Sequence, residues 1–252
     1  MHTEELDPHS IPVGERVSVA EGVSVERRSF FALAACALAA APGRAAALPR
    51  WAPGEATRFS YDEFLAEVVP LARALVLDTS ALGEDRYLLT VASLAVRLAD
   101  APVPEMRPNI KGDGPRTFIG SNEGGDPFVV LHWRMEPHST ISTHPHLYGN
   151  VVTLGLEGET RVRNYEAEGE LDTAASEPFR LRLVQDQLLR PGRFNLVPLA
   201  HGNFHGFDAG PDGARGLDIT TRIREKVPTP GLEISGEPVD ALRRIYTARW
   251  TG

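Results

Sequence analysis

The sequence predicts an all-β core, folded as a jelly-roll barrel and preceded by a pair of helices. Three observations lead to this fold class. After residue 116, apolar residues occur in short runs separated by Gly, Pro, Asn and Asp, a pattern typical of sandwiches and barrels. Two of these runs, 160–163 and 180–184, alternate polar and apolar residues, as strands with one buried face do. Before residue 100, apolar residues recur at helical spacing instead.

Composition narrows the classes of protein that fit the chain. It has 252 residues, 42% of them hydrophobic, which suits one domain with an extension or two small domains. The net charge of -8 and the lack of a basic stripe argue against nucleic acid as a partner. The only cysteine, Cys36, lies in a segment that we expect to be removed. The mature chain would then have no disulfide, no thiolate ligand and no cysteine nucleophile.

Residues 1–47 have the features of an export signal. Residues 1–26 are polar without periodicity, and we expect them to be disordered. Paired arginines at 27–28, an Ala-rich apolar run over 32–41 and small residues over 43–47 then follow in the order of a signal peptide. The Arg-Arg-x-Phe-Phe core resembles a bacterial twin-arginine signal.

This resemblance implies cleavage after Ala47 and a periplasmic or extracellular protein with no stable membrane insertion. The apolar run is shorter than the roughly 20 residues that span a bilayer. The alternative is an Ala-rich helix packed on the domain.

Two helices are expected next. Ser60 and Glu63 have the spacing of a capping box, with Ser60 at the N-cap and Glu63 at N3. Pro70 should kink this helix, because its ring blocks a backbone hydrogen bond. Gly83 separates it from a second predicted helix over 84–99. We expect this pair to support the barrel and find no chemistry in it.

The strands are predicted as nine short segments. They are 117–120, 127–135, 140–144, 151–156, 160–165, 179–184, 194–199, 204–208 and 217–223. For residues 240–250 we expect a short helix. The predicted organisation is therefore a disordered region with a signal, a helical segment, a barrel with a metal site and a C-terminal tail, over 1–47, 48–110, 111–225 and 226–252.

His144 and His146 are the residues on which the functional prediction depends. They are two residues apart, so in an extended strand both imidazoles point to the same face. Imidazole suits zinc, copper, iron and nickel, and a third ligand should come from a distant strand. His205 is favoured for this place, with His201 as a pocket residue; the alternative exchanges the two. The two remaining histidines of this region, His132 and His138, are expected to pack or to lie at the surface.

Two blocks of the sequence resemble the cupin motifs. The first is His144-x-His146 followed by a strand, and the second is 190–194 leading to Pro198 and a histidine. Cupins usually place a Glu a few residues after the histidine pair as a fourth ligand, and Asn150 and Val151 stand there instead. Three histidines without that Glu resemble the thiol dioxygenase branch, which includes cysteine dioxygenase and the cysteamine and plant cysteine dioxygenases.

Further segments carry this second resemblance. Gly-Asn-Phe-His at 202–205 is similar to the Gly-Asn-Ile-His that supplies the third ligand in the cysteamine and plant branch. Leu-Asp-Ile at 217–219 is similar to the Leu-Asp-Val that follows there, and 158–165 resembles the strand pair after the histidines. The chain departs from the branch in two ways: it keeps no cysteine for a Cys-Tyr crosslink, and Arg224 stands where the plant enzymes have a Tyr.

The resemblance implies an Fe(II)-dependent oxidoreductase that uses dioxygen to oxidise a small thiol to a sulfinate. It places Asp218 near the metal, either bonded to a ligating imidazole or capping a turn. Arg116 stands where cysteine dioxygenase has the Arg that binds the substrate carboxylate; the alternative is a surface arginine. His201 and Tyr148 complete the candidate catalytic residues.

Two other functions remain open at this point. One is a cupin with zinc, nickel or manganese that catalyses an isomerase or non-thiol dioxygenase reaction. The other is a periplasmic cupin that binds a metal or ligand without turnover.

Overall fold

The computed structural model describes residues 58–77, 79–99, 101–109, 116–123, 127–225 and 229–251. The predicted signal over 1–47 and its alternative, an Ala-rich helix, lie outside the described residues. Within the part that is described, no helix is both long and apolar enough to cross a bilayer.

Helix α2 (Tyr61–Leu77) begins at the predicted capping box. The Ser60 backbone N–H donates to Glu63 Oε2 over 2.8 Å, and the Glu63 N–H donates to Ser60 Oγ over 3.3 Å. These reciprocal bonds satisfy two of the amides that have no partner inside the first turn. The helix continues through Pro70 to Leu77.

Helix α3 (Ala81–Ala95) begins and ends earlier than the predicted range of 84–99. Ser80 is its N-cap, and the Ser80 hydroxyl accepts from the Gly83 N–H over 3.2 Å. Gly83 therefore lies in the first turn of α3 and does not separate the helices, because the local cap outweighs the low helix propensity of glycine.

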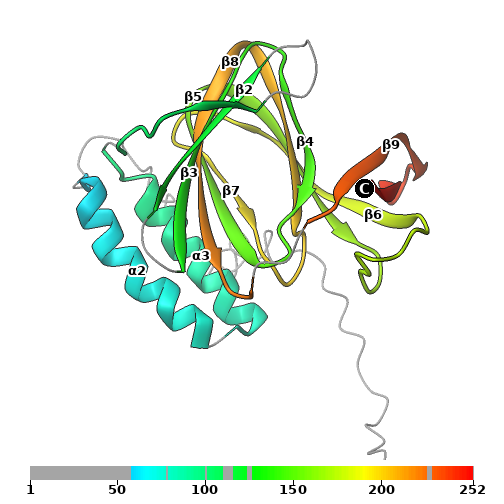
Figure 1. Ribbon diagram of the computed structural model, residues 1–252, viewed down its shortest axis with the longest axis horizontal. Helices are drawn as coiled ribbons and strands as arrows, with labels where there is room; N and C mark the ends of the chain where they lie inside the picture. Colours follow the sequence, from blue (N-terminus) through cyan, green and yellow to red (C-terminus); the bar gives the residue numbers. More distant parts are fainter. Residues whose placement is uncertain are drawn as a thin grey trace, which may run out of the picture. The chain divides into compact units, whose positions relative to one another are not determined.

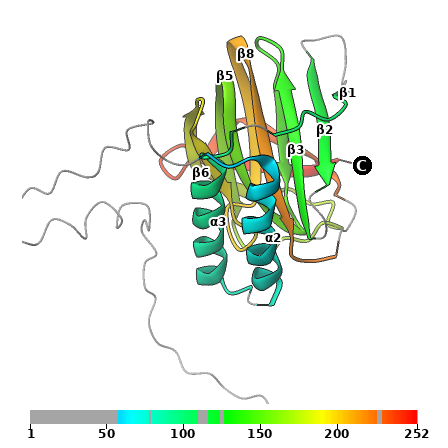
Figure 2. The same ribbon diagram turned by 90° about the vertical axis from the view of Figure 1, so that its left-hand side faces the viewer.

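The helical pair packs on one face of the sheet, as Figure 2 shows. Phe64 of α2 is fully buried, and its ring lies 6.3 Å from the Phe128 ring of the sheet, centroid to centroid. The core between helices and sheet also contains Val91, Val152 and Ile219. The predicted all-β core with a preceding helical pair is confirmed.

The described strands form one antiparallel sheet that curls into a barrel (Figure 1). They are β1 (Arg107–Asn109), β2 (Thr117–Glu123), β3 (Phe128–Met135), β4 (Thr140–Pro145), β5 (Gly149–Ala167), β6 (Phe179–Leu189), β7 (Phe194–Val197), β8 (Phe204–Arg222), β9 (Gly231–Asp240) and β10 (Ile245–Thr251). Their order is β1-β2-β3-β8-β5-β6-β10-β9, while β4 pairs with β8 and β7 with β5.

The long strands β5 and β8 cause the sheet to curl. Along its first part β8 pairs with β4, and along its later part it pairs with β3. Strand β5 pairs with β7 near its start and with β6 near its end. Each long strand thus passes from one set of neighbours to another, which curls the sheet without joining its two edges, β1 and β9.

Four of the predicted strands merge into two long, continuous strands in the structure. The segments 151–156 and 160–165 are both in β5, and 204–208 and 217–223 are both in β8. The Gly-containing segments that predicted turns form register shifts inside continuous strands. Gly158 and Gly213 have φ of +65° and +74°, which a residue with a side chain rarely adopts.

The predicted short helix at 240–250 is wrong. Strands β9 and β10 form an antiparallel hairpin, and residues 245–248 of β10 pair with residues 179–182 of β6. Arg244 in the connecting turn has φ of +57°. Backbone pairing with β6 satisfies amides of residues 245–248, so contact with a distant strand decides the structure of this segment.

Candidate metal centre

Two strands bring three histidines together. His144 lies near the end of β4, and His146 follows one residue after that strand. His205 is the second residue of β8 and pairs with His144 in the antiparallel register. The i, i+2 spacing aims His144 and His146 at the same face, and the register adds His205 to it.

The three ligating atoms lie close enough to share one ion. His146 Nε2 lies 2.9 Å from His205 Nε2, and His205 Nε2 lies 3.2 Å from His144 Nε2. With metal–nitrogen bonds of about 2.0–2.1 Å, these separations correspond to angles of roughly 90–100° at a shared ion. The donor set therefore fits a metal held from one side by three imidazoles.

The backbone sets the tautomer of His144. Its Nδ1 lies 2.9 Å from the carbonyl oxygen of Ser142. A carbonyl can only accept, so Nδ1 carries the proton and donates it. The lone pair then remains on Nε2, the nitrogen that faces the other two histidines.

The surroundings keep the two other rings neutral. Burial lowers the pKa of His146 well below its ordinary value, and the neighbouring His144 lowers it further. Burial likewise lowers the pKa of His205, with smaller effects from His144 and His146. Neutral imidazole is the form that binds a metal, so the site is prepared for a cation.

Asp218 lies beside the centre, on the side of the ligating nitrogens. Its Oδ2 is 4.0 Å from His205 Nε2, and its Oδ1 accepts a 2.7 Å hydrogen bond from the Thr153 hydroxyl. Burial raises the pKa of Asp218 to about 6, although the bond from Thr153 opposes this rise.

Both expected roles of Asp218 need correction. It does not orient His205 through Nδ1, since His205 Nδ1 has no hydrogen-bond partner within the described residues. It does not cap a turn either, because it lies inside β8 and pairs with residues of β3 and β5. Its carboxylate instead faces the place where a metal or its ligand would be.

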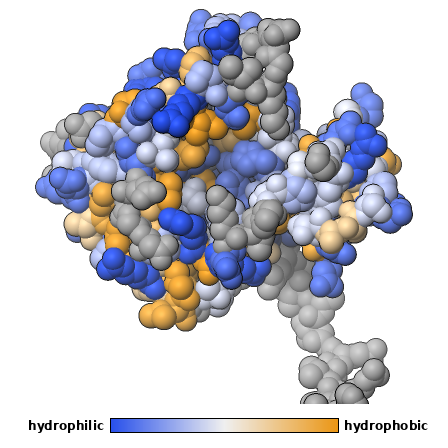
Figure 3. All heavy atoms as spheres, in the orientation of Figure 1, coloured by the Kyte–Doolittle hydropathy of each residue, from blue (hydrophilic) through white to orange (hydrophobic). Residues whose placement is uncertain are grey.

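An open pocket of about 840 Å³ leads to the histidines. His144, His146 and Tyr148 line it, and residues 229–232, where the C-terminal hairpin begins, form part of its wall. Serine and threonine hydroxyl groups are frequent in this wall: Thr117, Ser139, Thr140, Ser142, Thr143, Thr229 and Thr251. Figure 3 shows a hydrophilic hollow on this face, bordered by apolar atoms. Tyr148 lines the same pocket as His144 and His146.

Arg116 does not line this pocket. It directly precedes β2, its side chain is exposed, and its backbone N–H donates to Glu136 Oε2 over 2.8 Å. Thr117 and Ile119 of β2 do line the pocket. Because neighbouring residues of a strand point to opposite faces, Arg116 is directed away. The expectation that it binds a substrate carboxylate is not supported.

His201 lies apart from the three histidines. Its side chain is 44% exposed, and its Nε2 is 4.0 Å from Asp85 Oδ1 of α3. It belongs neither to the histidine cluster nor to the pocket wall. The structure therefore gives the third place in the cluster to His205, and a catalytic role for His201 has no geometric support.

The residues that replace the usual cupin Glu face two sides of β5. Asn150 is fully buried and donates from Nδ2 to Glu84 Oε1 of α3 over 3.0 Å, so it points away from the centre. Val151, its neighbour, faces the opposite side. Among the described residues, the cluster consists of histidines alone.

Glu84 is the residue that sequence reasoning missed. Its carboxylate is 3% exposed and lies under the loop that leads to His205. A signal was present, because Glu84 precedes Tyr87 and Val91 by three and seven residues. An acidic residue on the apolar face of a predicted helix is rarely buried without a partner.

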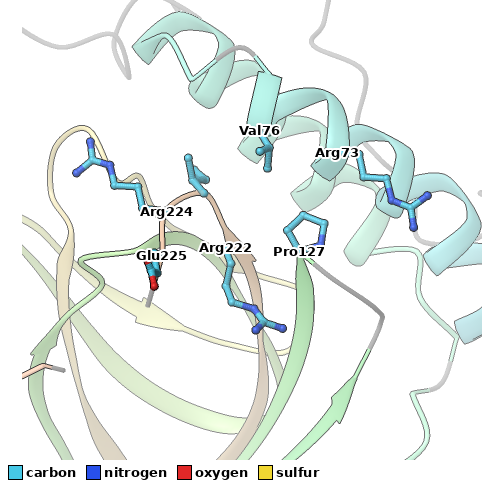
Figure 4. Close-up of a pocket in the computed structure, with 7 residues that line it drawn as sticks. Arg73, Val76, Pro127, Arg222, Arg224 and Glu225 are labelled. Carbon is cyan, nitrogen blue, oxygen red and sulfur yellow. The ribbon is translucent and has the colours of Figure 1, made fainter. Parts of the chain in front are cut away.

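A second hollow, of about 480 Å³, lies between α2 and the end of β8. Arg73, Arg222 and Arg224 line it together with Val76 and Glu225. Their guanidinium groups point in different directions (Figure 4). Because these charges do not converge, the hollow has no feature of a built anion site.

Comparisons with known proteins return likenesses of fold. No protein-family model matches the chain, and no curated protein matches its sequence. The cupin domain of Cnp3 from Schizosaccharomyces pombe matches with 13% identity and a TM-score of 0.34, over 48% of this chain and 70% of that one. KdgF from a Halomonas species matches with 16% identity and a TM-score of 0.31, over 46% and 87%. A cupin superfamily protein from Desulfitobacterium hafniense matches with 17% identity and a TM-score of 0.31, over 45% and 84%.

Proposed function

We propose that this chain is a metal-dependent cupin oxygenase that uses Fe(II) to oxidise a small thiol to a sulfinate. The observation that carries the proposal is the convergence of three Nε2 atoms at 2.9–3.2 Å with no carboxylate among them. Three neutral imidazoles would not themselves offset the charge of a bound Fe(II), which favours an anionic ligand such as a thiolate.

The residues of the chain would divide the work as follows. His144, His146 and His205 hold the cation from one side and leave the other side toward the pocket. When bound, Fe(II) supplies the affinity for a thiolate and the activation of dioxygen. Tyr148 and the hydroxyl groups of the wall are placed to hydrogen-bond the rest of the substrate.

Asp218 is the group placed to take the thiol proton. Its Oδ1 is engaged by Thr153, whereas Oδ2 faces the ligating nitrogen of His205. In the metal-free protein burial raises the pKa of Asp218 to about 6, and a bound cation would favour the ionised carboxylate, the form that accepts a proton. Overall, one thiol and one dioxygen give one sulfinic acid, so the reaction needs no further reductant.

One observation favours a second candidate, a cupin that uses another metal. Asp218 Oδ2 lies only 4.0 Å from His205 Nε2, so a small shift would add a carboxylate to the three imidazoles. Such a mixed set of nitrogen and oxygen donors suits zinc, nickel or manganese as well as iron. An isomerase or non-thiol dioxygenase reaction would then replace thiol oxidation.

Metal analysis and oxygen uptake separate these candidates. We expect protein purified without oxygen to contain stoichiometric iron and to consume dioxygen when cysteine, cysteamine or 3-mercaptopropionate is added. Zinc, nickel or manganese in place of iron would support the second candidate. Bound metal with no thiol-dependent uptake would contradict the oxygenase and support a binding protein without turnover.

We further propose that residues 1–47 direct export through the twin-arginine route, on the basis of Arg27-Arg28 and the apolar run that follows. Expression of the full chain in a bacterium with this route should give a periplasmic protein cleaved after Ala47. Replacing both arginines by lysine should keep the chain in the cytoplasm. Unchanged export of that variant would contradict the proposal.

A further inference from the structure

Glu84 is a buried carboxylate that the proposed chemistry does not use. It lies in the first turn of α3, is 3% exposed, and does not line the pocket. It accepts three hydrogen bonds: from the Leu199 N–H over 2.7 Å, from the Ala200 N–H over 3.0 Å and from Asn150 Nδ2 over 3.0 Å. Bonds of this kind, to a charged acceptor, are among the stronger ones in proteins.

These bonds reach both segments that carry the histidines. Asn150 follows His146 by four residues, so its amide ties the segment after the first two histidines to α3. Leu199 and Ala200 lie in the loop between β7 and β8, which leads directly to His205. One carboxylate therefore connects the segments of all three histidines.

Two further contacts belong to the same loop. The His146 N–H donates to the Asn203 carbonyl over 2.8 Å, so the loop is bonded to a histidine at its far end. Asp85, next to Glu84, faces His201 at 4.0 Å. The loop is thus held by α3 near its start and by the backbone of His146 near its end.

We propose that Glu84 is a positioning residue for the metal site, setting the distance between His146 and His205. The proposal rests on metal binding by the three histidines. Helix α3 then does more than support the barrel, since its first turn determines how well the ligands fit an ion. Outer groups that orient ligands change metal affinity by about 10–100-fold when they are removed.

Titration of metal-free protein with Co(II) tests this. Glu84→Gln keeps the size of the side chain but puts an NH₂ group opposite an N–H donor. We expect it to weaken Co(II) binding about tenfold or more and to shift the visible d–d absorption of the bound ion. Glu67→Gln is the matched control, because Glu67 is an exposed glutamate of the neighbouring helix α2. It should bind as the wild type does.

A purely structural role for Glu84 gives a different result. In that case Glu84→Gln would lower the stability of the metal-free protein in urea. It would leave the Co(II) dissociation constant and the spectrum of the folded protein unchanged. That combination overturns the proposal.

Asn150→Ala provides a second test should Glu84→Gln not fold, since it breaks one of the three bonds and keeps the carboxylate. A weaker Co(II) affinity supports the proposal, and wild-type affinity and spectrum in this folded variant overturn it. If the wild-type protein binds no Co(II), the proposed function is overturned as well. If the wild type binds Co(II) and Glu84→Gln binds it equally well, only the role of Glu84 is overturned.

Discussion

His144 and His205 face each other across the β4–β8 pair, and their Nε2 atoms lie 3.2 Å apart. The two histidines are 61 residues apart in the chain, so only the antiparallel register of their strands brings them together. A shift of one residue would turn one imidazole to the other face of its strand. The histidine cluster is therefore a consequence of strand pairing, and its members can be tested separately from nearby histidines.

Replacing His205 by Ala should remove the metal. It leaves only the imidazoles of His144 and His146, and we expect a loss of affinity beyond the roughly 10–100-fold that changes in outer groups cause. Metal content of the purified variant, measured by mass spectrometry, checks this. His201→Ala is the matched control, because His201 is exposed and faces Asp85. If His205→Ala keeps its full metal content and His201→Ala loses it, then His201 and not His205 is the third ligand.

Arg116→Ala should leave the reaction unchanged. The side chain is exposed and does not line the pocket, so the KM for cysteine should change by no more than about twofold, as for surface charges in general. Steady-state oxygen uptake with cysteine and with cysteamine, which lacks the carboxylate, measures this. A tenfold rise in KM for cysteine alone would show that Arg116 docks the carboxylate after all.

Local features of the fold were predictable from the sequence. The capping box at Ser60 and Glu63 and the shared face of His144 and His146 depend on residues within four positions of each other. Such patterns need no knowledge of distant contacts.

Features that depend on distant pairing were not predictable. The glycine at 158 indicated a turn, but it forms an irregularity inside β5 because β8 continues alongside. Residues 240–250 were predicted as a possible short helix, yet 241–244 form a turn and 245–248 pair with β6 as part of β10. Arg116 stood at the right distance along the chain from the histidines, but only the pleat of β2 decides where it points.

Gly158→Ala should destabilise the folded protein by about 2 kcal/mol or more. Its φ of +65° costs a residue with a side chain about 1–3 kcal/mol, and a methyl group there would collide with the Gly213 carbonyl oxygen. Urea unfolding gives the free energy. Gly236→Ala is the control, because a methyl group at Gly236 meets no atom within 4 Å; its change should stay within about 0.5 kcal/mol. Equal stability of both variants would argue against the described irregularity in β5.

Asp218→Asn should stabilise the metal-free protein at pH 8. Burial raises the pKa of Asp218 from 3.8 to about 6, so the folded state prefers the protonated form. The stability that protonated Asp218 contributes to the folded state is therefore fully present below pH 3.8. This contribution is lost as the pH rises through about 6. A shift of about two pKa units corresponds to roughly 3 kcal/mol, which is the upper limit of the gain from Asn at high pH.

The measurement compares urea unfolding of the wild type and Asp218→Asn from pH 4 to 8 in the presence of a chelator. His146 and His205 act in the opposite direction: their lowered pKa values favour the folded state above the ordinary value of 6.5 and cost stability as the pH falls below it. The wild type and Asp218→Asn both carry these histidines, so the difference between their free energies of unfolding isolates Asp218. The advantage of Asn should shrink toward zero near pH 4. A difference that is constant across this range, or that grows at low pH, would mean that the carboxylate is charged at no cost in the folded protein.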